Sequence, residues 1–173
     1  MEKFWNTDKI VSISAILIGV GSLVVVTYQT ELIQREQRTS VMPYLEFESR
    51  TPTANRTEVY LVNSGLGPAL VKEVRVHFDG ATYPVDLFGY FLNNYELTDG
   101  AYTFNRVFVG DLISADQNMT LISSDPNDPA FSKFLERLNR GEINFEIIYE
   151  SLYGEPWLSS IIKNAPIRLE DED

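Results

Sequence analysis

The 173-residue chain contains no cysteine and only one histidine. The absence of cysteine excludes disulfide bridges, cysteine-ligated zinc and a thiol nucleophile. His77 has no acidic or second histidine partner at a recognisable spacing, so we interpret it as an exposed strand residue and not as a general base or metal ligand. We therefore expect no catalytic residue, no cofactor and no metal, and we expect that the protein is not an enzyme.

Basic residues are outnumbered in this chain. It contains 14 Lys and Arg and 25 Asp and Glu, which gives a formal net charge of −11. Residues 1–40 hold four basic and four acidic side chains, so the whole excess lies in residues 41–173. Such a surface repels phosphate backbones and anionic lipid headgroups. Nucleic acid is therefore not an expected partner.

Charge is absent between Lys9 and Glu31. Within this interval Ile10–Tyr28 is mostly apolar, and at about 1.5 Å per residue it spans roughly 28 Å, close to the hydrocarbon thickness of a bilayer. The apolar region of a cleavable signal peptide is usually shorter, and no A-x-A-like cleavage site follows this one. We predict an N-terminal flank (residues 1–9) and a retained single-pass transmembrane helix (residues 10–28) that acts as a signal-anchor in the cell membrane.

One face of the predicted membrane helix carries small residues. The spacing of Ser12, Ala15, Gly19 and Ser22 places them on the same side of a helix. Small side chains allow a second helix to approach closely, so this is a possible helix-pairing face. The alternative is that small residues are simply common in membrane helices.

Residues 29–42 contain neither glycine nor proline and are rich in helix formers. They predict a helical stalk that continues the membrane helix until Pro43 stops it. Basic residues flank the membrane segment almost equally, since Lys3 and Lys9 precede it and Arg35 and Arg38 follow it. The positive-inside rule alone therefore does not decide the orientation.

Short runs of alternating apolar and polar residues begin after Pro43 and are typical of strands. They lie at residues 44–48, 58–62, 69–78, 81–87, 102–109, 118–123, 142–150 and 156–163. These runs predict a mainly β domain over residues 43–169, an antiparallel β-sandwich, followed by an acidic tail over residues 170–173.

One helix is predicted within the sandwich. Asp128 is a suitable N-cap, Pro129 suits the first turn and Gly141 suits the end of the helix, which would pack on the sheets through an apolar face. The segment Asp86–Gly100 is ambiguous between a short helix and a long aromatic loop. Part of the aromatic run could be core or an exposed partner-binding patch; the run comprises Phe88, Tyr90, Phe91, Tyr95, Tyr102, Phe104 and Phe108.

The stretch Val62–Leu70, "VNSGLGPAL", is the most motif-like run in the chain. A dinucleotide fingerprint needs a third glycine and a following helix, but Leu70 occupies the glycine position and a β-branched run follows. Pro68 also removes a backbone N–H where a phosphate would need it. We interpret Asn63, Gly65, Gly67 and Pro68 as a structural turn between two strands, in which the glycines provide positive φ.

The combination of an anchor, "VMPYLEF", "LVNSGLGPALVKEVRV" and "IIYESLYGEPWLS" resembles a loose group of uncharacterised bacterial single-pass membrane proteins. That group pairs an N-terminal anchor with a small β-sandwich marked by N-x-G-x-G-P-A, matched here by Asn63, Gly65, Gly67, Pro68 and Ala69. The resemblance implies the architecture and no catalytic residues. It also implies that the sandwich lies on the cytoplasmic side.

Two pairs of carboxylates do not form a convincing site. Asp125 and Asp128 lack the alternating ligands of a calcium loop, and capping of the following helix accounts for Asp128 more simply. Glu146 and Glu150 share one strand face, which we expect to be solvated.

These observations favour a single-pass, membrane-anchored β-sandwich that acts without catalysis as a protein-interaction or assembly module. Its expected partners are the lipid bilayer and either another protein or further copies of the chain. An alternative is a membrane effector or sensor in a bacterial stress or phage-defence system, and an anchored hydrolase is a more distant third possibility.

Overall fold

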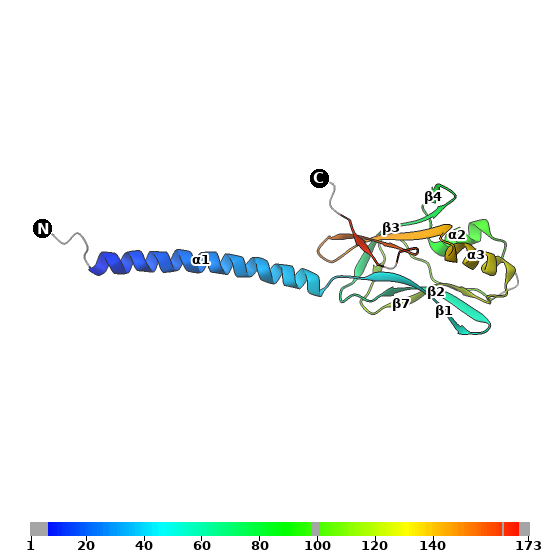
Figure 1. Cartoon of the computed structure of the whole chain (residues 1–173), viewed down its shortest axis with the longest axis horizontal. Coiled ribbons are helices and arrows are strands. Elements are labelled where there is room, and N and C mark those ends of the chain that lie inside the picture. Colours follow the sequence, from blue (N-terminus) through cyan, green and yellow to red (C-terminus); the bar gives the residue numbers. More distant parts are fainter. Residues whose placement is uncertain (1–6, 98–100, 164, 170–173) are drawn as a thin grey trace. The chain divides into compact units, whose positions relative to one another are not determined.

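The computed structural model of the chain describes residues 7–97, 101–163 and 165–169. These residues form two compact units, one that ends at Ser40 and one that begins at Val41 (Figure 1). Most of the predicted N-terminal flank and the predicted tail over residues 170–173 lie outside the described residues.

The first unit is a single helix, α1 (Thr7–Ser40), of 34 residues. It runs without interruption through the predicted membrane segment and continues through the predicted stalk (residues 29–42) as far as Ser40. Its 26-residue stretch Lys9–Gln34 is long and apolar enough to cross a membrane, and none of that stretch is buried in the structure. The apolar side chains of α1 therefore have no protein core around them.

The second unit consists of two antiparallel sheets. The first sheet has the order β1 (Leu45–Thr53), β2 (Arg56–Asn63), β7 (Asn118–Ser124) and β5 (Thr103–Phe104). The second has the order β10 (Ile167–Arg168), β9 (Pro156–Ser160), β8 (Ile143–Glu150), β3 (Ala69–Phe78) and β4 (Ala81–Tyr83), and β6 (Leu112–Ile113) also pairs with β3. The predicted mainly β fold is confirmed.

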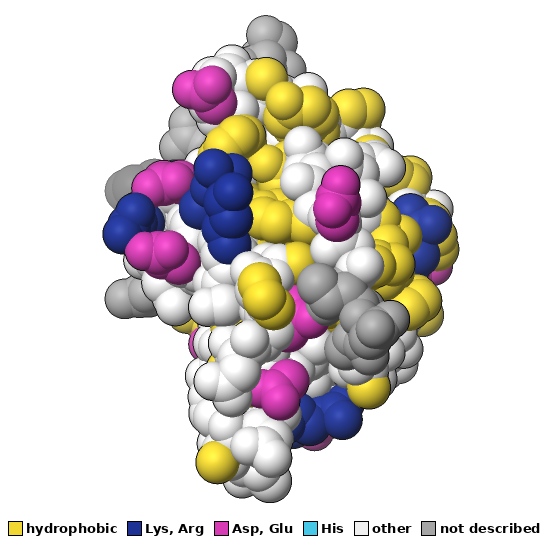
Figure 2. Space-filling view, turned by 90° about the vertical axis from the view of Figure 1, so that its right-hand side faces the viewer, with side chains coloured by type: hydrophobic (Ala, Val, Ile, Leu, Met, Phe, Trp, Pro, Cys, Tyr) yellow, Lys and Arg dark blue, Asp and Glu magenta, His cyan; other side chains and the backbone are white. Residues whose placement is uncertain are grey.

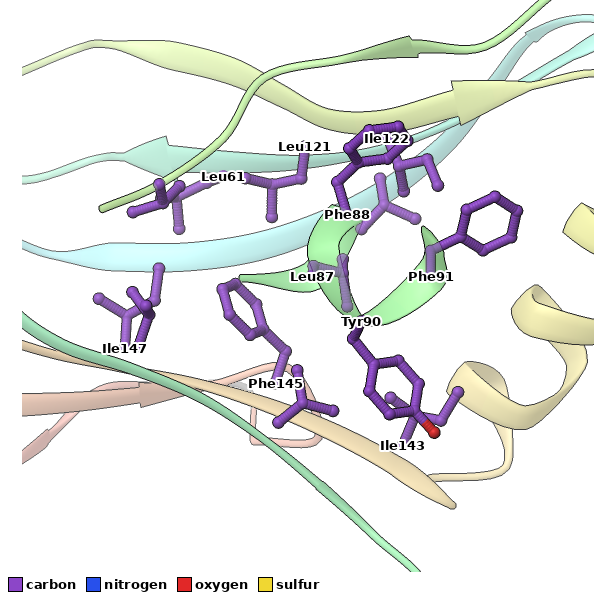
Figure 3. Packing of buried hydrophobic residues seen from close by; sticks show 14 of the residues in the cluster. Leu61, Leu87, Phe88, Tyr90, Phe91, Leu121, Ile122, Ile143, Phe145 and Ile147 are labelled. Carbon is purple, nitrogen blue, oxygen red and sulfur yellow. The ribbon is translucent and has the colours of Figure 1, made fainter. Parts of the chain in front are cut away.

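The core lies between the two sheets and contains a short helix. Strand residues that alternate inward bring Leu61 and Ile122 of one sheet toward Phe145 and Ile147 of the other (Figure 3). The ambiguous segment forms helix α2 (Leu87–Asn94), which lies in the space between the sheets and is apolar on several sides for that reason.

Helix α3 (Pro129–Asn139) is confirmed with its predicted start. The Asp128 carboxylate accepts a hydrogen bond from the Phe131 N–H at 2.8 Å, and Pro129 occupies the first turn. Phe131, Phe134 and Leu138 are buried and attach the helix to the core.

Three predicted strands are shorter in the structure by three residues or more, and one of them, the run at 156–163, ends as a strand at Ser160. The run at 81–87 ends as a strand at Tyr83, because Pro84 has no N–H to offer the ladder. The run at 102–109 keeps only β5, because its second half turns toward the other sheet, where the Gly110 N–H donates to the carbonyl of Val71 at 2.9 Å.

Phe91 of α2 is the centre of the aromatic core. Its ring lies 5.2 Å from each of the rings of Tyr95 and Phe134 and 5.5 Å from that of Tyr102, and its side chain is fully buried. We predict that Phe91→Ala lowers the free energy of unfolding by about 3–5 kcal/mol through lost burial and a residual cavity. The measurement is denaturant unfolding followed by near-UV circular dichroism.

The neighbouring residue gives a matched control. Leu92 belongs to the same helix but is 41% exposed, so Leu92→Ala should change the unfolding free energy by much less. Equal losses in the two variants would contradict the placement of α2 between the sheets.

Candidate functional site: the start and the free edge of strand β1

Gly65, Gly67 and Pro68 of the predicted turn lie in the link between β2 and β3, and Asn63 is the last residue of β2 before it. This link packs against the first residues of the sandwich. The Ser64 N–H donates to the Tyr44 carbonyl at 2.9 Å, and the Leu66 N–H donates to the Met42 carbonyl at 3.1 Å. The link therefore continues the β1–β2 pairing beyond β1 toward Val41.

Gly65 and Gly67 are required for a reason other than the predicted one. Neither has a φ in the left-handed region, so the expectation of positive φ is wrong. A Cβ on Gly65 would lie 2.4 Å from the Met42 oxygen, and one on Gly67 would lie 1.8 Å from the Val41 oxygen. Both glycines are therefore needed because the backbone of 41–44 approaches too closely for any side chain.

The carboxamide of Asn63 joins this link to its surroundings and is fully buried. Its Oδ1 accepts hydrogen bonds from the N–H of Tyr44 at 3.0 Å and of Gly65 at 3.1 Å. Its Nδ2 donates to the carbonyls of Gly67 at 2.9 Å and of Ile113 and Ser114 at 3.1 Å each. Both lone pairs and both N–H groups of the amide are thus used.

Two hydroxyl groups of the opposite sheet hold the first residue of β1. The Tyr149 hydroxyl accepts a hydrogen bond from the Leu45 N–H at 3.3 Å, and the Ser159 hydroxyl donates to the Leu45 carbonyl at 2.6 Å. Burial raises the pKa of the Tyr149 phenol, so this group stays protonated. The corner between the sheets is therefore closed at Leu45.

Beyond Leu45 the outer edge of β1 is open. β1 is the first strand of its sheet and pairs only with β2 there. Because Leu45 turns its N–H and C=O away from β2, the antiparallel alternation turns those of Phe47 and Ser49 the same way. These two residues present unpaired donors and acceptors of the kind to which an added strand binds.

A cavity of about 370 Å³ lies beside this edge. Its walls come from three elements: Phe47–Ser49 of β1, Leu138–Gly141 at the end of α3, and the Ile161–Ile162 segment after β9. Phe47, Leu138 and the two isoleucines make the cavity apolar in part, and Glu48 and Arg140 add one charge of each sign. We call this cavity and the open edge of β1 the β1 groove.

His77 does have an acidic partner, which the sequence spacing did not reveal. Its Nε2 lies 3.0 Å from Glu146 Oε2 on the neighbouring strand β8, and its Nδ1 lies 2.9 Å from the Thr82 hydroxyl. Arg75 Nε also donates to Glu146 Oε2 at 2.8 Å, and Asn144 Nδ2 donates to Glu146 Oε1 at 2.8 Å.

These neighbours cover Glu146, which was predicted to be solvated. It is only 8% exposed, so the expected solvated face is wrong at this position. Desolvation by itself raises the pKa of Glu146, but the hydrogen bonds from Arg75 and His77 outweigh it and hold the pKa below its usual range. The residues form a charged network on the face of the second sheet.

Most of the predicted aromatic run belongs to the core. Phe88, Tyr90, Phe91 and Tyr95 are buried, whereas Phe104 and Phe108 are about half exposed. Figure 2, which looks at the end of the sandwich that carries α2 and α3, shows hydrophobic side chains near the middle of this face with charged side chains around them.

The remaining predicted site residues lie in α1. Ser12, Ala15, Gly19 and Ser22 are exposed along the helix, and a Cβ placed on Gly19 would have open space around it. Pairing through this face stays a prediction. Among the residues that the structure describes, no group of three His, Asp or Glu side chains could hold a metal ion.

No protein-family model, curated protein or solved structure matches the chain. The resemblance to bacterial single-pass membrane proteins therefore depends on the quoted sequence motifs.

The close approach at the β2–β3 link gives a direct test. We predict that Gly65→Val and Gly67→Val each destabilise the sandwich by about 1–3 kcal/mol or more, because the added side chain meets backbone that cannot move aside easily. Thermal unfolding measures this loss. Nucleotides should not shift the unfolding temperature of the wild type.

Leu66, between the two glycines, provides the control. It is 74% exposed, so Leu66→Val should leave the unfolding temperature nearly unchanged. If the two glycine variants melted like this control and the wild type were stabilised by nucleotides, the interpretation as a structural link would fail.

Proposed function

We propose that the protein is a single-pass, membrane-anchored β-sandwich that acts without catalysis as a protein-interaction module. The β1 groove is the observation that supports this proposal most strongly. An open strand edge beside an apolar cavity can bind an extended peptide, because backbone groups supply hydrogen bonds and the cavity receives a side chain.

The partner would be an extended segment of another protein. Because α3 and the Ile161–Ile162 segment stand beside the edge, a single strand fits there better than a strand that already belongs to another sheet. A bulky apolar side chain suits the cavity walls. Since the net charge of −11 lies wholly in residues 41–173, a basic segment is favoured by long-range attraction.

The membrane part of the proposal relies on α1. Its stretch Lys9–Gln34 has the length and composition of a membrane span. The cytoplasmic side that we propose for the sandwich follows from the resemblance in sequence motifs. The small-residue face of α1 offers a second contact, through which two copies could assemble in the bilayer.

The proposal is tested by a pull-down of the full chain from detergent-solubilised membranes. Ser49→Pro removes an N–H that faces away from β2, and proline is tolerated on the outer side of an edge strand. We predict that this substitution lowers recovery of the specific partner about tenfold, since it removes one hydrogen bond and blocks the approach of a strand.

Ser49→Ala is the matched control, because it keeps the backbone N–H and should recover the partner as the wild type does. Circular dichroism confirms that each variant is folded. Equal recovery by the proline and alanine variants would show that partners bind elsewhere.

A further inference from the structure

Four aliphatic side chains are the most exposed large hydrophobic groups among the described residues of the sandwich. Their relative exposures are 74% for Leu66, 65% for Leu152, 63% for Val109 and 55% for Leu112. They come from three separate connections and from the start of one strand, so their exposure is not a property of a single loop.

Strand pairing brings two of these residues to the same end of the second sheet. Leu70 of β3 pairs with Leu112 of β6 on one side and with Glu150 of β8 on the other. Leu152 follows two residues after Glu150, in the turn between β8 and β9. Leu112 and Leu152 therefore stand on either side of the start of β3.

Hydrogen bonds bring the other two to this end. The Gly110 N–H donates to the Val71 carbonyl at 2.9 Å, which places Val109 beside the start of β3. The Leu66 N–H donates to the Met42 carbonyl at 3.1 Å. We call Leu66, Val109, Leu112 and Leu152 the apolar rim, and it surrounds the end of the sandwich at which residues 41–44 are held.

A short segment of chain joins this end to the apolar stretch of α1. Val41 follows Gln34, the last residue of the stretch that is long and apolar enough to cross a membrane, by seven positions, and it follows Tyr28, the end of the predicted membrane segment, by thirteen. At about 1.5 Å per helical residue these separations are about 10 Å and about 20 Å. The end of the sandwich that carries the rim is therefore the end at which the chain enters it from α1.

The chemistry of the rim favours lipid over a charged partner. All four side chains are uncharged aliphatic groups, which gain free energy when they leave water. The acidic sandwich repels anionic headgroups, so contact depends on apolar insertion into a neutral surface and not on electrostatic attraction.

We propose that the apolar rim inserts into the interfacial layer of the bilayer that α1 crosses, so that the sandwich lies directly against the membrane. This inference rests on the proposed anchoring by α1. Contact of the rim with the bilayer leaves the β1 groove, on the side of the sandwich, open to a partner.

The absence of native cysteine allows a clean test. Single-cysteine variants of the full chain are labelled with the environment-sensitive fluorophore NBD and reconstituted into phosphatidylcholine vesicles. The rim sites are Leu66→Cys and Leu152→Cys. Asn55→Cys, in the exposed turn between β1 and β2, is the matched control, and Val20→Cys reports on α1.

We expect the two rim labels to lose most of their emission to a nitroxide carried near the lipid headgroup, while the Asn55 label keeps its emission. The Val20 label should be quenched by a nitroxide deep in the acyl chains. Rim labels that stay unquenched beside a quenched Val20 label would overturn the inference and leave the anchor intact. If the emission wavelength of the rim labels shifted but the nitroxide did not quench them, the rim would contact a second copy of the chain and not lipid, and the inference would be overturned. An unquenched Val20 label would refute the anchoring by α1.

Discussion

Asn63 joins three backbone segments through one buried carboxamide: the residue before β1, the link between β2 and β3, and the end of β6. Its own backbone also pairs across the sheet, since its N–H donates to Gln117 and its carbonyl accepts from Asp116. A side chain that lacks the C=O or the NH₂ of this carboxamide would leave several of these backbone groups without a hydrogen bond. Each such buried group would lower the free energy of unfolding by about 1–3 kcal/mol. The first residues of the sandwich therefore depend on this amide and on the two glycines that make room for them.

The fixed start of β1 has consequences for both proposed surfaces. At Leu45 the hydroxyls of Tyr149 and Ser159 close the corner between the sheets, and beyond it the edge at Phe47 and Ser49 is open beside the cavity. Three residues before Leu45, the hydrogen bond from the Leu66 N–H to the Met42 carbonyl holds Met42 against the link between β2 and β3. Neighbouring hydrogen bonds thus set the position of the β1 groove and that of Leu66 in the apolar rim.

Local patterns in the sequence were sufficient for the mainly β fold and for α3. Apolar and polar residues alternate along the strands because one side of each strand faces the core. The sequence Asp128-Pro129 is a strong local signal for the start of a helix. The signal in residues 86–100 was ambiguous, because a helix enclosed between two sheets is apolar on several sides and lacks a clear helical period.

The site could be predicted only in part, because its geometry depends on contacts between distant segments. The sequence singled out Asn63, Gly65 and Gly67, but close approach of residues 41–44 replaced the expected positive φ as the reason for the glycines. The partnership of His77 with Glu146 spans 69 positions, so no spacing rule could find it. The groove likewise combines β1, α3 and the segment after β9.

Amide hydrogen exchange at single-residue resolution, measured on the full chain in lipid nanodiscs without a partner, tests this account most directly. We expect slow exchange for the N–H groups of Tyr44 and Leu45, which donate to Asn63 and Tyr149, and fast exchange for those of Phe47 and Ser49 at the open edge. Fast exchange at Tyr44 would contradict its hydrogen bond to Asn63, and slow exchange at Phe47 and Ser49 would contradict the open edge of β1.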